Sequence, residues 1–168
     1  GGATIPLGLP ASSADAYNIG SPGPMAVAPN GDIAWSDYYG GNGLIFWDAS
    51  EDIVSQLVAQ ASSNSGFGGQ ASNATVGGRI MGVAFDSDNN VYFTVNHQVM
   101  MVDMTTGIFD LVAGSGNSGS PDFSLPALEI DLPTAAGIVW NDDDSKLYIN
   151  ILGNHMVGEM DAATGAVK

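Results

Sequence analysis

One stretch of the chain decides its fold class: Ile80-Met81-Gly82-Val83-Ala84-Phe85-Asp86-Ser87-Asp88-Asn89-Asn90-Val91-Tyr92-Phe93-Thr94-Val95. Two runs of apolar, β-branched and aromatic residues lie on either side of a short polar segment. The runs favour β-strands, and the Asp, Ser and Asn residues between them tolerate the backbone angles of a tight turn. The stretch therefore predicts a β-hairpin.

The same hairpin pattern occurs three times. The first strands are expected at 24–28, 80–85 and 136–140, and the second strands at 33–36, 91–95 and 147–151. A pattern that returns at a fixed spacing indicates repeated structural units. The chain is therefore divided into an N-terminal arm at 1–23 and three repeats at about 24–79, 80–134 and 135–168.

Each repeat continues into a third strand that ends in an acid, at Asp48, Asp103 and Asp161. Fourth strands are expected at 53–59 and 108–114. Residues 50–61 alone also fit a short amphipathic helix, but their alignment with the second repeat favours a strand.

Two long segments, 61–79 and 115–133, connect the repeats and are rich in Gly, Ser and Asn. This composition is typical of surface connections rather than of a core. We therefore expect both connections to lie on the surface, outside the core.

The composition supports an all-β fold. The 168 residues include 23 Gly and 8 Pro, which disfavour long helices and indicate dense turns. The net charge of −15 repels phosphate backbones and anionic lipid, so we expect neither a nucleic-acid partner nor membrane insertion. There is no Cys, which excludes disulfides and thiolate sites. The chain starts at Gly1 and lacks a bilayer-length apolar run, so we expect a processed, soluble form.

The second repeat resembles a known kind of blade. Its stretch Gly82 to Tyr92 is followed by Asn96-His97-Gln98-Val99 and by Leu111-Val112-Ala113-Gly114-Ser115-Gly116, motifs that resemble NHL-repeat β-propellers. The third repeat keeps Leu147-Tyr148 and Asn154-His155, and the first has Trp35-Ser36-Asp37 and Asn42-Gly43. The resemblance covers 24–165. It lacks the basic residue that often follows Asn-His in the family, where Gln98 and Met156 stand.

The resemblance implies blades of four antiparallel strands and no single activity, since the family includes scaffolds, ligand binders, lyases and lactonases. Closed propellers typically have about four to eight blades. The ring is therefore expected to be completed by another copy or by sequence outside these residues. Related lactonases hold a channel metal with Glu, Asn and Asp, but Glu51, Glu129 and Glu159 do not match the start of a first strand.

Candidate ion sites are few. The oxygens of Asp86, Asp88 and Asn90 have the spacing of the start of a calcium loop, but a hairpin turn explains the same residues. His97 and His155 stand in corresponding turns, where packing against a neighbouring repeat is favoured over a shared metal. No catalytic residue set is identified, and Ca²⁺ is the one cofactor for which the sequence gives a candidate.

Two other features concern the surface. Asn73-Ala74-Thr75 is an N-glycosylation sequon in the first connection, usable if the protein is exported. Trp35, Trp47 and Trp140 lie in expected strands, where core filling is favoured over sugar stacking.

The sequence of the N-terminal arm indicates self-association. Ile5, Leu7 and Leu9 alternate with other residues, as in a half-buried strand, and Pro6 is tolerated at a sheet edge. The third repeat stops before a full fourth strand, so this arm is expected to complete a third blade, in its own chain or in another copy. We therefore expect an extracellular or cell-surface structural protein whose partner is itself, as a closed dimer or a filament. The alternative is a ligand-binding or metal-dependent propeller enzyme acting at the central channel.

Overall fold

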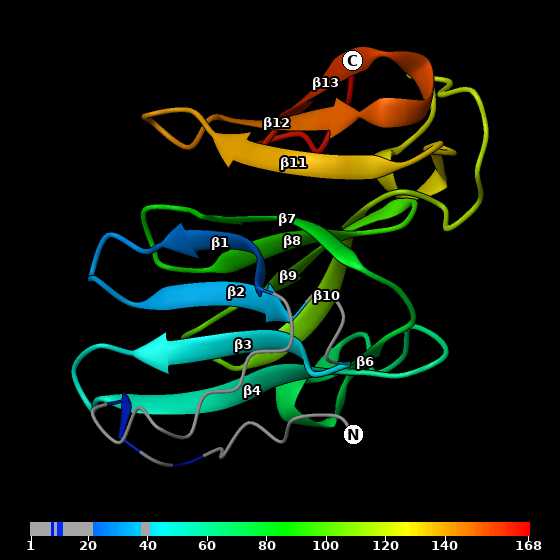
Figure 1. Cartoon of the computed structure of the whole chain (residues 1–168). Helices are drawn as coiled ribbons and strands as arrows, with labels where there is room; N and C mark the ends of the chain where they lie inside the picture. Colours follow the sequence, from blue (N-terminus) through cyan, green and yellow to red (C-terminus); the bar gives the residue numbers. More distant parts are fainter. Residues whose placement is uncertain (1–7, 9, 12–21, 38–40) are drawn as a thin grey trace.

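Three sheets lie side by side in the computed structural model, which describes residues 8, 10–11, 22–37 and 41–168 (Figure 1). Their strands are antiparallel except for one parallel pair at the edge of the first sheet. The first blade contains β1 (Pro22–Val27), β2 (Ile33–Asp37), β3 (Gly43–Asp48) and β4 (Ile53–Gln60). The second contains β7 (Ile80–Phe85), β8 (Val91–Val95), β9 (Gln98–Val102) and β10 (Ile108–Ala113). The third contains β11 (Ala135–Trp140), β12 (Lys146–Ile151) and β13 (Met156–Asp161). The expected all-β propeller blades are confirmed, and β4 is a strand rather than a helix.

The hairpin turns form for the reason expected from the sequence. Asn89 and Asp144 adopt the left-handed conformation, with φ of 66° and 52°, and Gly31 stands in the shorter turn of the first blade with φ of 96°. Asn, Asp and Gly are the residues that tolerate this conformation best. The three first-to-second strand pairings share a register shift, between Pro22 and Met25, Ile80 and Gly82, and Ala135 and Ile138.

The connections between blades are not only surface loops, which corrects that expectation. The first connection forms β5 (Gly69–Gln70), η2 (Ala71–Asn73) and β6 (Thr75–Val76). β6 extends the first sheet beside β4, and β5 extends the second sheet beside β10. The second connection contains η3 (Ala127–Glu129), and η4 (Leu152–Asn154) precedes β13. Buried residues in these connections are Ala71, Ala74, Val76, Ala127, Ile130 and Leu132.

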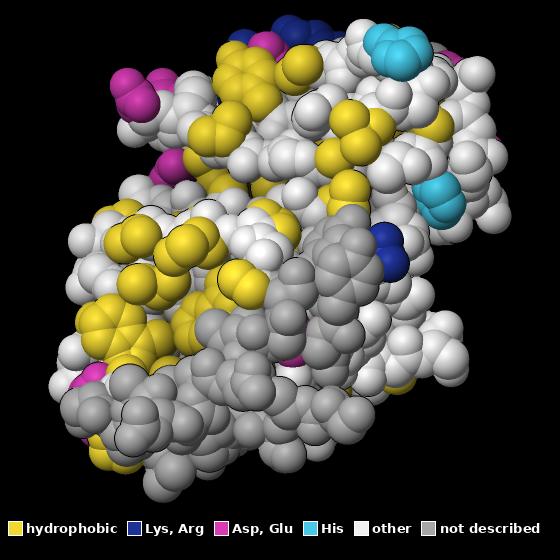
Figure 2. Space-filling model, in the orientation of Figure 1, with side chains coloured by type: hydrophobic (Ala, Val, Ile, Leu, Met, Phe, Trp, Pro, Cys, Tyr) yellow, Lys and Arg dark blue, Asp and Glu magenta, His cyan; other side chains and the backbone are white. Residues whose placement is uncertain are grey.

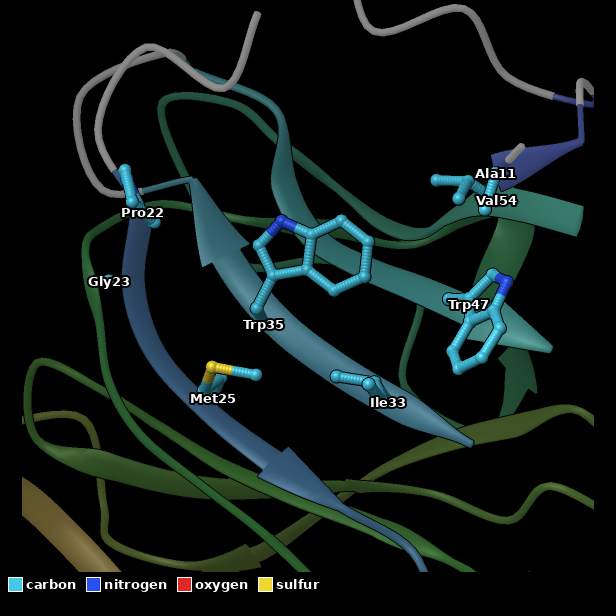
Figure 3. Close-up of a pocket in the computed structure, with 8 residues that line it drawn as sticks. All are labelled: Ala11, Pro22, Gly23, Met25, Ile33, Trp35, Trp47 and Val54. Atoms are coloured by element: carbon cyan, nitrogen blue, oxygen red, sulfur yellow. The ribbon is translucent and has the colours of Figure 1, made fainter. Parts of the chain in front are cut away.

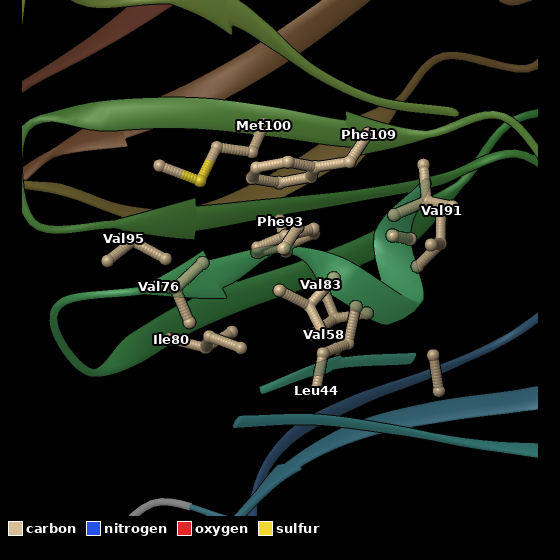
Figure 4. Packing of buried hydrophobic residues seen from close by; sticks show 14 of the residues in the cluster. Leu44, Val58, Val76, Ile80, Val83, Val91, Phe93, Val95, Met100 and Phe109 are labelled. Atoms are coloured by element: carbon tan, nitrogen blue, oxygen red, sulfur yellow. The ribbon is translucent and has the colours of Figure 1, made fainter. Parts of the chain in front are cut away.

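The blades pack through their faces. β7 lies between β1 and β11 (Figure 1). Between the first and second blades, Leu44 and Val58 pack with Phe93, Met100 and Phe109 (Figure 4). The Phe93 and Phe109 rings are stacked, with centroids 6.2 Å apart. A second cluster joins the second and third blades; its members include Val99, Ala113, Ile130, Leu147, Ile149 and Ile151.

Residues near the two ends of the chain pair with β4 of the first blade and β13 of the third. Gly8 and Ala11 donate their N–H groups to the Val54 and Asp52 carbonyls, 2.9 Å each, and Pro10 bridges to Ile53, so the described part of the arm lies on the first blade. At the other end Val167 bridges to Met160, so the third blade does begin a fourth strand of its own. Ile5, Leu7 and Leu9 lie outside the described residues, and strand donation by the arm stays a prediction. No helix in the described ranges is long and apolar enough to cross a membrane.

Candidate functional site

Each blade has two faces, and the second blade shows what each face contacts. Its N-side face, towards the first blade, carries Val91 and Phe93. Its C-side face, towards the third blade, carries Tyr92 and Thr94, because side chains of a strand alternate between faces. Tyr92 meets the edge of Trp140 at 4.9 Å between ring centroids.

The N-side face of the first blade lines a hollow whose side chains are apolar. Ile33 and Trp35 occupy the register positions of Val91 and Phe93, as shown by the pairs Val27–Ile33 and Phe85–Val91. The face surrounds a hollow of about 320 Å³ (Figure 3), and its lining residues are Ala11, Pro22, Gly23, Met25, Ile33, Trp35, Trp47 and Val54. Figure 2 shows hydrophobic side chains gathered over this blade.

Exposure distinguishes this face from its counterparts. Met25 is 60% exposed, whereas Val83, at the same register position in the second blade, is 7% exposed. Val27 is 61% exposed at the position that Trp140 holds in the third blade. Positions that bury apolar side chains between blades elsewhere in the molecule are therefore open on the first blade.

The two tryptophans of this face are not equivalent. The indole N–H of Trp47 donates to Asp52 Oδ1 at 3.1 Å. The Trp35 indole nitrogen is buried and has no hydrogen-bond partner among the described residues. Both rings pack beside the small cluster of Ile45 and Val54, so the expected core-filling role is met in part, on a face that stays open.

The C-side face of the third blade is the second open face. Val139 is 57% exposed and Val157 is 66% exposed. They line a hollow of about 380 Å³ together with Tyr148 and Asn150. Glu159 accepts from Lys146 Nζ at 2.7 Å and from Lys168 Nζ at 3.0 Å, and these bonds, that of Lys146 first, lower the pKa of Glu159.

The expected calcium residues lie in the turn between β7 and β8. Asp86 Oδ1 accepts the N–H groups of Asp88 and Asn90, at 3.0 and 2.8 Å, and Oδ2 accepts the Asn90 amide at 2.9 Å. The carboxylate thus organises the turn. Burial, followed by the charge of Asp86, raises the pKa of the neighbouring Tyr92. Calcium binding here stays a prediction.

The two histidines lie in turns between second and third strands, as expected. His155 is exposed in the left-handed conformation, and His97 is partly buried. Within the described ranges no group of three His, Cys, Asp or Glu side chains is placed to hold a metal ion. Asn73 is exposed at the end of η2, and its glycosylation stays a prediction.

The acids that end the third strands have one common role. Asp48 accepts from the Ser50 hydroxyl, Asp103 from the Thr106 N–H and Asp161 from the Thr164 hydroxyl. These bonds lower the pKa of each carboxyl. The recurring acid is therefore explained by the turn that it stabilises.

Sequence reasoning missed the open faces as a site. The available signal was alternation: Ile33 and Trp35 on β2, and Ile45 and Trp47 on β3, each lie two residues apart and so share one face. Whether a blade packs against that face is decided only by the three-dimensional arrangement.

Comparison with solved structures supports the propeller fold. No protein-family model and no curated protein matches the chain. A Bacteroides thetaiotaomicron protein of unknown function is 17% identical with a TM-score of 0.64, over 82% of this chain and 33% of that one. An auxiliary nutrient binding protein from Bacteroides ovatus is 17% identical, with a TM-score of 0.62, over 88% and 35%. Virginiamycin B lyase from Staphylococcus aureus is 17% identical, with a TM-score of 0.56, over 88% and 40%.

These neighbours are propeller-like proteins, and the blades of this chain are compatible with that fold. The chain spans about a third to two fifths of their length. At this level of identity the likeness concerns the fold alone, and the NHL family stays a resemblance.

Proposed function

We propose that this chain is a structural or interaction module of the β-propeller class that associates with copies of itself. The observation that carries the proposal is the N-side face of the first blade, which exposes Met25 and Val27 at positions that are packed between the other blades. Leaving apolar surface of this kind in water is unfavourable, by roughly 25 cal/mol per Å². Contiguous apolar patches on soluble proteins commonly mark interaction sites.

Two modes of association are compatible with the chain. One is packing of open blade faces, which the exposed side chains support. The other is donation of the arm segment containing Ile5, Leu7 and Leu9 to a sheet edge in another copy. Two contacts of the described arm residues support this second mode: Gly8 donates to the Val54 carbonyl in β4, and Ala11 donates to the Asp52 carbonyl just before that strand. Face packing needs no rearrangement of these contacts.

Sedimentation velocity of the wild-type chain over a wide concentration range tests the proposal. We expect the average mass to rise with concentration. A mass that stays at that of one chain at every concentration would overturn it. Deletion of residues 1–10 separates the two modes, since face packing survives the deletion and strand donation does not.

An extracellular or cell-surface location is part of the proposal. The exposed Asn73 acceptor in the first connection supports it, because a sequon can be used only on an accessible segment. Expression through a glycosylating secretory pathway tests it. We expect secreted chain whose added mass is lost in an Asn73→Gln variant, and retention of the whole product inside the cell would contradict the location.

A further inference from the structure

The joint between the second and third blades shows how one blade face recognises the next. Thr94, fully buried on the C-side face of the second blade, donates its hydroxyl to the Ala136 carbonyl on β11 at 2.6 Å. The joint between the first and second blades repeats this contact, since the Ser36 hydroxyl lies 3.5 Å from the Ile80 carbonyl on β7. A polar side chain of the second strand therefore reaches the innermost strand of the following blade.

Close approach of the innermost strands is the second element of the joint. A Cβ on Gly82 would lie 2.3 Å from the Ala136 carbonyl oxygen and 2.9 Å from the Ile138 nitrogen. Glycine is therefore required at this position, because backbone atoms cannot give way as a flexible side chain can.

The C-side face of the third blade carries the same elements without a following blade. Asn150 stands at the register position of Thr94, Tyr148 at that of Tyr92, and Gly137 corresponds to Gly82. Asn150 is exposed, and a Cβ on Gly137 would meet nothing within 4 Å. This face has the recognition groups of a blade joint and an open place for a partner.

We propose that the C-side face of the third blade packs on the N-side face of the first blade of a second copy. This inference rests on the proposed self-association and names its joint. Repetition of the joint identifies the occupant: both joints inside the chain pair a C-side face with an N-side face, and the two open faces of the described blades are one of each kind. In the joint, Tyr148 lies against Val27, and Asn150 donates to the carbonyl of Pro22 or Gly23. These two residues stand at the register positions of Ile80 and Ala136, whose carbonyls face the Ser36 and Thr94 hydroxyls in the internal joints.

Such a contact is heterologous, so it closes into a ring of copies or continues as a filament. The proposed joint lacks one element of the internal joints, a hydrogen bond between the hairpin turns of neighbouring blades. The Asn30 N–H donates to Asn89 Oδ1 and the Ser87 N–H donates to Asp144 Oδ2, whereas the first blade has Gly31, without a side chain, in the accepting position. The net charge of −15 also opposes association, so the joint is expected to strengthen as salt screens the repulsion.

Two variants block one face each. Gly137→Val fills the open place on the third blade, and Ser118→Val adds the same side chain at an exposed position in the second connection. Met25→Glu puts a charge on the open face of the first blade, and Leu128→Glu puts one on an exposed residue of η3. Because Gly137 and Met25 face open space, both variants are expected to keep the wild-type circular dichroism and thermal midpoint.

Light scattering of the single variants and of their mixture tests the joint. We expect Gly137→Val and Met25→Glu to weaken association more than about tenfold, a change of roughly 1.4 kcal/mol. The two controls should associate as wild type does. An equimolar mixture should form dimers and stop there, since only one good joint remains. Association that neither variant weakens, or dimers of either variant alone as strong as those of the mixture, would overturn this joint while leaving self-association intact. A wild-type chain that stays monomeric would overturn both.

Discussion

Alanine at Gly82 is predicted to destabilise the chain, and alanine at the corresponding Gly137 is not. Both glycines lie on innermost strands, and neither has a positive φ, so backbone conformation does not distinguish them. The surroundings do. The added Cβ at position 82 would lie 2.3 Å from the Ala136 carbonyl oxygen, whereas ordinary contacts begin at 3.4 Å, so β7 and β11 must separate by about 1 Å.

The magnitude follows from two opposing effects. Overpacking of a close-fitting interface costs about 1–3 kcal/mol, and replacing Gly by Ala returns about 0.4–1 kcal/mol by restricting the unfolded chain. Gly82→Ala should therefore lose about 1–2 kcal/mol. For a domain of this size that lowers the midpoint of unfolding by about 2–8 °C. Gly137→Ala has only the favourable effect and should unfold at or slightly above the wild-type temperature.

Thermal unfolding measured by circular dichroism tests this pair. It should be done at the lowest usable protein concentration, so that association does not add to the apparent stability. Equal midpoints for the two variants, or a larger loss for Gly137→Ala, would refute the assignment of the third blade's C-side face as open.

Three further predictions concern stability. Turn hydrogen bonds lower the pKa of Asp103 in the folded state, so the contribution of its carboxylate to stability is complete above the unfolded-state pKa of about 3.9 and is lost as pH falls through the folded-state pKa. In the Asp103→Asn variant the thermal midpoint should therefore fall less steeply with acid than in the wild type. An unchanged dependence of the midpoint on pH would contradict this. Millimolar Ca²⁺ at matched ionic strength should raise the wild-type midpoint but not that of Asp88→Asn; equal wild-type midpoints would remove the calcium site. Phe109→Ala, which empties a fully buried position between blades, should cost about 3–5 kcal/mol in urea unfolding, and a loss below 1 kcal/mol would argue against that core.

The strands could be predicted from the sequence because the same hairpin pattern occurs three times. β7 and β8 begin and end at the residues expected, and β4 is a strand although its own sequence also fits a helix. A single repeat would not have resolved that ambiguity, since residues 53, 57 and 61 fall on one face in either interpretation.

The connections could not be predicted in the same way. Val76 and Ile130 are buried, but each is isolated among Gly, Ser, Asn and Asp residues, and one apolar residue shows no periodicity. The burial of such residues depends on which blades they bridge, and this is a tertiary property. The isolated bridge between Val167 and Met160 was not predicted either, because a single apolar residue after Gly165 shows no strand periodicity.

The candidate site was the least predictable part. The sequence marks Asp86, Asp88 and Asn90 as possible calcium ligands, and in the structure the Asp86 carboxylate accepts hydrogen bonds from the other two and so organises their turn. The open faces are composed of the same residue types as the buried ones. Only their exposure distinguishes them, as for Met25 against Val83.

Disulfide trapping tests the proposed joint most directly, because the chain contains no cysteine to interfere. Gly23→Cys and Asn150→Cys are made as separate variants, mixed and oxidised, and the products are separated without reductant. If the C-side face of the third blade meets the N-side face of the first blade in another copy, the mixture should give a covalent heterodimer in preference to either homodimer. The Leu128→Cys variant, mixed with Gly23→Cys, is the control and should give little heterodimer. Equal trapping in the two mixtures, or homodimers alone, would contradict the account.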